Sequence, residues 1–223
     1  MPSPAVYKSP RGLATAASVL LGLCATASLG SAVGIALLRA DNGVGALLTL
    51  FASGMLGLLV LGTIGVFVPW LYRVRVNAEV IHPHSALSLP ARWWTIGGWF
   101  IPFACLFMPW RTVRGVWQAS APTDDHGVPR PIGTVAVTAW WTTLMLGSLL
   151  ARLGSSVMDS TTSATYEDSR QQALSLLVCS EVLLIAAAVL AIVVVRRLTA
   201  MQEAHAEAAH ARAAAYWAQM QAV

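Results

Sequence analysis

The chain has 223 residues, of which 57% are hydrophobic and 11% are charged, and its formal net charge is +4. Soluble domains carry about 25% charged residues, so this composition excludes an ordinary soluble globule. The basic surplus is almost wholly Arg, and in so apolar a chain it indicates orientation in a membrane and not a nucleic-acid partner.

Four apolar runs are each long enough to cross about 30 Å of hydrocarbon as a helix that rises 1.5 Å per residue. They occupy residues 13–38, 44–71, 132–151 and 174–195. No alternating strand pattern competes with them, and a lipid-exposed segment must satisfy its own backbone hydrogen bonds. The sequence therefore predicts an all-α polytopic protein, with a four-helix transmembrane domain at 1–195 and an Ala-rich helical tail in the cytosol at 196–223.

The first run, 13–38, has a second interpretation as a signal peptide. Lys8 and Arg11 precede its apolar core, and the Ala-Thr-Ala triplet at 25–27 resembles a signal-peptidase site. The apolar residues continue well past that triplet, beyond the length of a normal signal-peptide core. We therefore expect an uncleaved membrane anchor.

Small residues recur at every fourth position of the same run, so they share one face of the expected helix. They are Ser18, Gly22, Thr26, Gly30 and Gly34. Such a stripe lets a second helix approach closely, most tightly at Gly30 and Gly34. The partner is either another helix of this chain or a second copy of the protein, and we favour packing within the chain.

An apolar segment with two prolines follows the second run and reads WWTIGGWFIPFACLFMPW at 93–110. Residues 96–110 would reach only about 22 Å as an ideal helix, which is less than the hydrocarbon thickness. Pro102 would break that helix, whereas Pro109 suits the first position of a new one. The sequence therefore predicts a re-entrant or interfacial segment at 94–110 in place of a further crossing.

The distribution of basic residues tests this topology independently. If 94–110 returns to the inner face, eleven basic residues lie inside and three outside, whereas a crossing there would divide them seven to seven. The inner set is Lys8, Arg11, Arg73, Arg75, Arg92, Arg111, Arg114, Arg130, Arg196, Arg197 and Arg212; the outer set is Arg39, Arg152 and Arg170. Cytoplasmic loops are enriched in Lys and Arg. We therefore expect a multi-pass protein of the cell membrane with both termini in the cytoplasm.

The inner region between the second and third runs, 72–131, contains a short amphipathic pattern at 109–120. Trp110 and Trp117 fall on its apolar face, and this pattern is typical of a helix that lies in the membrane surface. Arg111 and Arg114 lie towards the other face and are candidates for contact with anionic lipid headgroups. The alternative is that they only set orientation and that the Trp residues are ordinary interfacial anchors.

Two polar positions on the predicted membrane helices need an explanation. Asn77 lies four residues after Arg73, on one helix face, and we expect it to bond free backbone carbonyls near Pro102. Glu181 is the one acid inside a predicted span, where a charge is costly. It either binds a proton or cation, or it accepts hydrogen bonds from Thr or Trp of the third span, and we favour the structural interpretation.

The central stretch resembles a bacterial membrane family known as domain of unknown function 4328. The resemblance rests on WLYRVRVNAEV, GGWFIPFACLFMPW and VWQAS, and covers about 44–195. The matching residues are Arg73, Asn77, Ala78, Gly97, Gly98, Trp99, Phe100, Pro102, Leu106, Pro109, Trp117, Ala119 and Ser120. Cys105 stands where many relatives would have Asn. The resemblance implies about four spans and a membrane location, but no activity.

Signatures of catalysis, nucleotide binding and metal binding are missing from the sequence. We therefore expect no enzyme, metal or cofactor. The leading hypothesis is a regulatory or scaffolding membrane component that contacts the lipid bilayer or a membrane-protein partner, a second copy included, through its inner-face Trp and Arg residues. The alternative is a small transporter or channel-like protein that uses the re-entrant segment and Glu181, and a lipid-modifying enzyme is a weaker third.

Overall fold

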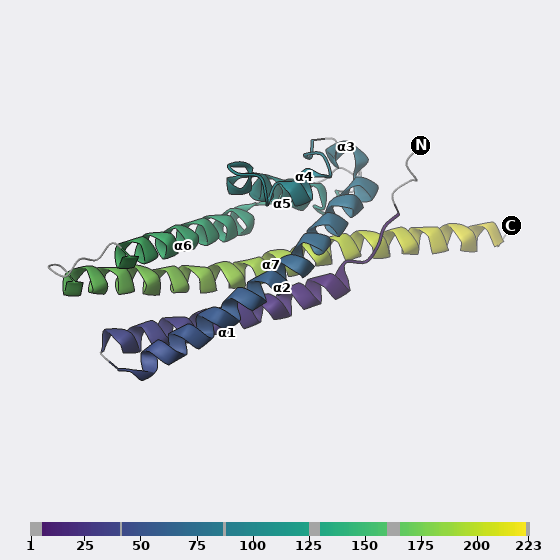
Figure 1. The fold of residues 1–223 in the computed structure, drawn as a ribbon. Helices are drawn as coiled ribbons and strands as arrows, with labels where there is room; N and C mark the ends of the chain where they lie inside the picture. Colours follow the sequence, from purple (N-terminus) through teal and green to yellow (C-terminus); the bar gives the residue numbers. More distant parts are fainter. Residues whose placement is uncertain (1–5, 41, 87, 125–129, 160–165, 222–223) are drawn as a thin grey trace. The chain divides into compact units, whose positions relative to one another are not determined.

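The computed structural model describes residues 6–40, 42–86, 88–124, 130–159 and 166–221. All of the secondary-structure elements within these residues are helices, which confirms the all-α prediction (Figure 1). In chain order the helices are α1 (Arg11–Arg39), α2 (Val44–Ile81), α3 (Pro83–Ala86), α4 (Trp94–Gly97), the 3-10 helix η1 (Ala104–Leu106), α5 (Met108–Ala119), α6 (Val135–Asp159) and α7 (Tyr166–Gln221).

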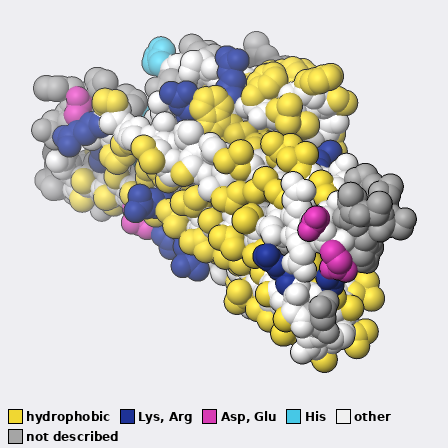
Figure 2. Space-filling model, turned by 90° about the vertical axis from the view of Figure 1, so that its left-hand side faces the viewer, with side chains coloured by type: hydrophobic (Ala, Val, Ile, Leu, Met, Phe, Trp, Pro, Cys, Tyr) yellow, Lys and Arg dark blue, Asp and Glu magenta, His cyan; other side chains and the backbone are white. Residues whose placement is uncertain are grey.

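Three of these helices, α1, α2 and α7, are long and apolar enough to cross a membrane. They contain three of the predicted spans, and α2 and α7 extend well beyond theirs. Figure 2 shows hydrophobic side chains over much of the visible surface, as lipid-facing helices require. The chain therefore has the character of a multi-pass membrane protein. Helix α6 has sufficient length, but its Trp140-Trp141-Thr142-Thr143 run and Arg152 lower its hydropathy, so a fourth span stays a prediction.

The chain forms two compact units, and the long helices contribute to both. The first unit consists of Met1–Thr15, Phe67–Thr134 and Val194–Val223, and the second consists of Ala16–Val66 and Val135–Val193. Helix α7 runs unbroken through residue 195, where the sequence predicts the change from membrane helix to helical tail.

In the second unit, α1 and α2 pack closely against each other at positions occupied by glycine. A Cβ atom on Gly34 would lie 2.5 Å from the Thr49 Oγ1 atom, and one on Gly45 would lie 2.6 Å from the Gly34 carbonyl oxygen. Gly30 faces Ala52 in the same way, whereas Gly22 has no such neighbour. The expected packing within the chain is thus confirmed for the Gly30–Gly34 end of the stripe.

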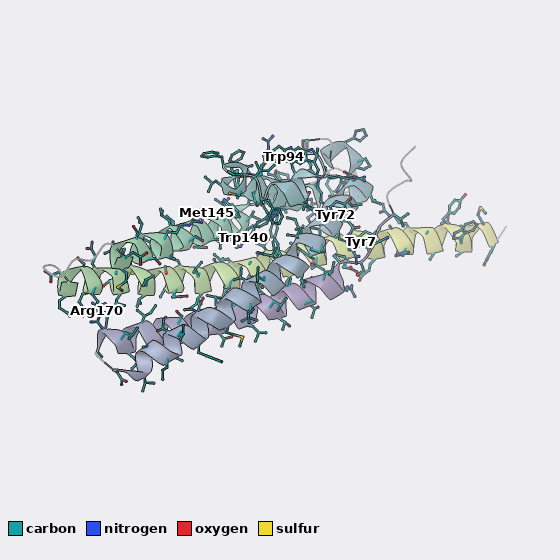
Figure 3. The ribbon with its side chains drawn as sticks, viewed as in Figure 1. Tyr7, Tyr72, Trp94, Trp140, Met145 and Arg170 are labelled. Atoms are coloured by element: carbon teal, nitrogen blue, oxygen red, sulfur yellow. The ribbon has the colours of Figure 1, made fainter. Side chains whose placement is uncertain are left out.

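Helix α7 packs against α6 and holds the end of α1 in the same unit. Added Cβ atoms on Gly147 and Gly154 would meet leucine side chains of α7 at 3.1 Å and 2.9 Å. The Arg170 guanidinium donates to the Leu38 carbonyl over 2.9 Å (Figure 3). Because the last carbonyls of a helix lack partners in their own helix, this bond caps α1.

Candidate membrane-contact site

The segment 94–110 of the first unit is not one helix. It consists of α4, a series of turns, η1 and the beginning of α5, and Pro109 lies in the first turn of α5 as predicted. Gly98 allows a close approach here, because a Cβ atom on it would lie 2.6 Å from the Trp94 carbonyl oxygen and 3.0 Å from the Met108 Cβ atom. The stretch is therefore divided into short helical pieces and is not one continuous helix.

Large apolar side chains on this segment, and on Trp93 just before it, are exposed. We call them the apolar loop, which comprises Trp93, Ile96, Phe100, Ile101, Phe103, Leu106 and Phe107. Phe103 is 81% exposed and Phe100 is 69% exposed. Each such side chain gains about 1.5–3 kcal/mol when it is removed from water, and contiguous patches of this kind mark contact with a membrane or a protein.

Phe103 also has an unusual backbone conformation, with φ 63° and ψ −42°. A bulky residue at positive φ costs about 1–3 kcal/mol and persists where the surrounding structure requires it. Phe103 is also the most exposed large apolar residue among those described. Burial of its ring in a leaflet or in a partner would offset a cost of this size.

The base of the loop is anchored to α2. Thr95 and Ala104 are buried, and the Trp99 ring meets the Phe67 ring edge-on with centroids 5.8 Å apart. Phe67 lies near the end of the apolar run 44–71, just before Tyr72 and Arg73. The loop is therefore held against the part of α2 where the sequence changes from apolar to polar.

Helix α5 corrects one expectation. Its apolar residues Val113, Val116 and Trp117 are buried in the protein, and the Trp117 indole donates to the Gly133 carbonyl over 3.2 Å. The hypothesis that this face lies in the membrane surface was therefore wrong. The reason is physical, because a helix packed on protein and a helix packed on lipid have the same hydrophobic period.

The charged face of α5 is exposed, as expected. Arg111 and Arg114 both lie on the surface, and the Arg114 guanidinium carbon lies 5.2 Å from the centre of the Trp110 ring. Such a cation–π contact orients the cation without neutralising it. Arg111 and Arg114 therefore present positive charge beside the apolar loop, within one rigid helix.

Three other arginines of the predicted inner set make contacts within the protein. Arg75 is buried and donates to Glu79 over 2.6 Å and to the Pro90 carbonyl over 3.0 Å. Arg92 also pairs with Glu79, so the two arginines and one acid tie the start of the loop segment to α2. Arg73 donates to the Ser9 carbonyl over 3.3 Å.

A comparison of the sequence with known families gives one match. The sequence model described as "Domain of unknown function (DUF4328)" matches residues 33–200. The chain belongs to the DUF4328 family. No curated protein and no solved structure matches it significantly.

In this DUF4328 protein, Asn77 holds the segment before α1. Its amide donates to the Lys8 carbonyl over 2.9 Å and to the Gln202 Oε1 atom over 3.1 Å, and its oxygen accepts from the Lys8 N–H over 3.1 Å. Gln202 in turn donates to the Val74 carbonyl and the Ser120 hydroxyl. The bonds therefore do not run to the Pro102 region, because the N-terminal segment supplies the free backbone groups.

Glu181 lies in the second unit of the DUF4328 protein, on α7. Its side chain is almost fully buried, and its Oε2 atom has no hydrogen-bond partner. Thr143 of α6, one of its expected donors, bonds the Ala139 carbonyl of its own helix over 2.8 Å. The carboxyl group is thus partly unsatisfied within an apolar helix.

Sequence reasoning missed Gln202, Lys8 and the Glu79–Arg92 pair. The only local pattern that could have indicated one of these contacts is the four-residue spacing of Arg75 and Glu79, which places the two side chains side by side on a helix. The part of the chain that the structure describes contains no group of three or more metal-ligating side chains.

Proposed function

We propose that this protein is a non-catalytic regulatory or scaffolding component of the cell membrane, which contacts lipid or a membrane partner through the apolar loop and the neighbouring Arg111 and Arg114. One observation carries the proposal. Seven large apolar side chains are exposed on a proline-broken segment that is anchored beside the polar end of α2's apolar run. Two exposed guanidinium groups follow directly on α5.

The proposed topology has four spans, with α6 as the fourth and both termini in the cytoplasm. The positive-inside rule supports it, because eleven of fourteen basic residues then lie inside. The apolar loop would enter the inner leaflet and leave on the same side, and Phe103 would lie below the headgroups. Arg111 and Arg114 would remain at headgroup depth, where each contributes about 1 kcal/mol of attraction to anionic lipid.

The test compares the lipid that copurifies with three proteins in mild detergent, measured by native mass spectrometry. The wild type is set against Arg111→Gln/Arg114→Gln, which removes both charges, and Arg111→Lys/Arg114→Lys, which keeps them. We expect the Gln variant to lose about tenfold or more of its anionic lipid, since two charges contribute about 2 kcal/mol together. Equal anionic lipid on all three proteins would contradict the proposal.

Glu181 supports a second candidate function, a small transporter or channel-like protein. A carboxyl oxygen buried without a partner in an apolar helix is a position where a proton or cation could bind. Ion or proton flux into vesicles that stops in Glu181→Gln would favour this function. A flux equal to that of empty vesicles would exclude the transporter or channel-like function.

A further inference from the structure

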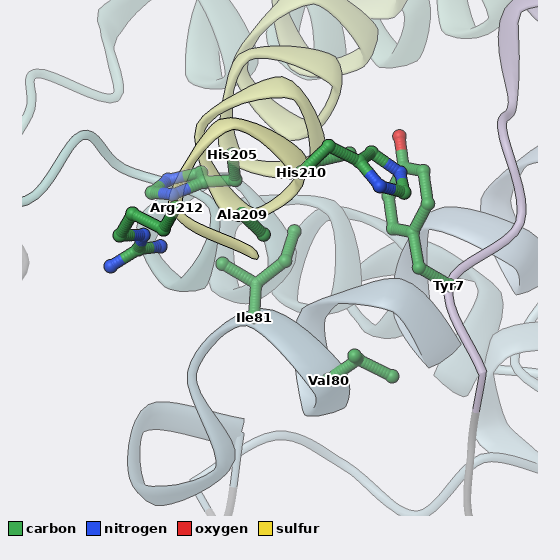
Figure 4. Close-up of a pocket in the computed structure, with 8 residues that line it drawn as sticks. Tyr7, Val80, Ile81, His205, Ala209, His210 and Arg212 are labelled. Carbon is green, nitrogen blue, oxygen red and sulfur yellow. The ribbon is translucent and has the colours of Figure 1, made fainter. Parts of the chain in front are cut away.

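A pocket of about 260 Å³ lies within the first unit, away from the apolar loop (Figure 4). It opens between the segment before α1, the end of α2 and the last third of α7. Its lining residues are Tyr7, Val80, Ile81, His205, Ala206, Ala209, His210 and Arg212. The volume is slightly below the range of about 300–1,000 Å³ that is usual for ligand sites, so it suits a small molecule.

Part of the pocket lining is apolar, and Val80 and Ala209 within it are exposed to solvent. Val80 and Ile81 come from α2, and Ala206 and Ala209 come from α7. The pocket exists because both α7 positions are alanine, since larger side chains at these positions would fill it. A short alkyl chain could therefore pack against these four side chains.

The groups around this apolar part are hydrogen-bond donors or can carry positive charge. Figure 4 shows His205 and Arg212 on one side and His210 and Tyr7 on the other. The Arg212 Nε atom donates to the Ala208 carbonyl over 3.2 Å, which leaves both terminal amino groups for a ligand. The His205 Nε2 atom donates to the Ala121 carbonyl over 3.0 Å, so the ring is held in place, and when the ring is protonated its Nδ1–H is a second donor.

The nearest acids do not cancel this charge. Glu203 and Glu207 of α7 do not line the pocket, and both pair with Arg11, over 3.0 Å and 2.8 Å. The Tyr7 hydroxyl is buried beside Glu203. Burial, and then a hydrogen bond to the Glu203 carboxylate, raise the pKa of Tyr7 well above its ordinary value. Tyr7 therefore keeps its proton.

We propose that this pocket binds a small phosphate monoester with a short apolar body, a function separate from the membrane contact of the apolar loop. A guanidinium fork and two protonated imidazoles provide enough donors for the three terminal oxygens of a phosphate, more than the two oxygens of a carboxylate need. A soluble phosphate ester and a phosphate-bearing lipid share this chemistry.

The test is isothermal titration of the full chain in mild detergent with butyl phosphate, 1-butanol and dihexanoyl phosphatidic acid. Butyl phosphate should bind saturably and 1-butanol should not. Tighter binding of the phosphatidic acid would identify a lipid as the source, and tighter binding of butyl phosphate a soluble ester. Absence of saturable binding by both phosphates would overturn the proposal.

Variants on α7 locate the binding. Arg212→Gln should weaken butyl phosphate binding by about tenfold or more, because it removes a charge-assisted bond, and Ala209→Leu should abolish binding by filling the pocket. Arg197→Gln and Ala211→Leu are matched controls on exposed positions outside the lining, and they should bind as the wild type does. If Arg212→Gln and Ala209→Leu bind butyl phosphate as the wild type does, the ligand binds elsewhere and the proposal is overturned.

Discussion

Replacement of Asn77 by Ala should release the segment before α1. The change removes both side-chain bonds to the Lys8 backbone and leaves the fully buried Gln202 Oε1 atom without its donor. Each lost hydrogen bond contributes about 1 kcal/mol net, and a stranded buried acceptor adds to this cost. We expect the free energy of opening this segment to fall by about 2–3 kcal/mol, which is a factor of roughly 30 to 150 in the open population.

Limited proteolysis measures that population. Trypsin cleaves after Lys8 only when the segment is open, and when opening and closing are fast the cleavage rate follows the open population. Release of the fragment 1–8, followed by mass spectrometry, should therefore be roughly 30 to 150 times faster in Asn77→Ala. Arg73→Gln is the matched control, because it removes one exposed bond to Ser9 and should change the rate little. Equal rates in the two variants would refute the role given to Asn77.

Three further predictions concern stability in detergent, measured as the thermal midpoint. Gly34→Leu should lower the midpoint sharply and Gly22→Leu should not, since only Gly34 has backbone and side-chain atoms of α2 within van der Waals distance. The raised pKa of Tyr7 stabilises the folded protein at pH values below the ordinary tyrosine pKa, and this stabilisation is lost as the pH rises towards the pKa of Tyr7 in the folded state. Above about pH 10, the thermal midpoint of the wild type should therefore fall more than that of Tyr7→Phe. Glu181→Leu should keep or raise the midpoint, because it removes an unsatisfied buried carboxyl oxygen.

Each of these predictions has a contradicting result. Equal midpoints for the two glycine variants would show that α1 and α2 do not depend on close contact at Gly34. Parallel alkaline curves for the wild type and Tyr7→Phe would remove the link between Tyr7 and stability. A large loss of midpoint in Glu181→Leu would show that the carboxyl group has partners on which the helix packing depends.

The helices could be predicted because they depend on composition and length. Apolar runs identified α1, α2, α6 and α7, and the pair Gly30–Gly34 identified a close helix contact. The break before α5 followed from Pro102 and from the shortness of the apolar stretch. These signals are local, so a single sequence contains them.

The remaining features depend on contacts that are distant in sequence. Lys8 and Gln202 meet Asn77 across 69 and 125 residues, and no local pattern indicates such a pairing. The helix period alone could not tell whether Val113 and Trp117 face protein or lipid. The positive φ of Phe103 was equally hidden, because such a conformation is usually signalled by Gly, Asn or Asp.

The central claim is that the apolar loop lies in the leaflet. A spin label at position 103, in a protein whose three cysteines are replaced by serine, tests it in lipid nanodiscs through accessibility to oxygen and to a water-soluble nickel chelate. A label at the exposed position 118 of α5 is the control. The account predicts high oxygen and low nickel accessibility at 103, and the reverse at 118. High nickel accessibility at 103 would contradict it.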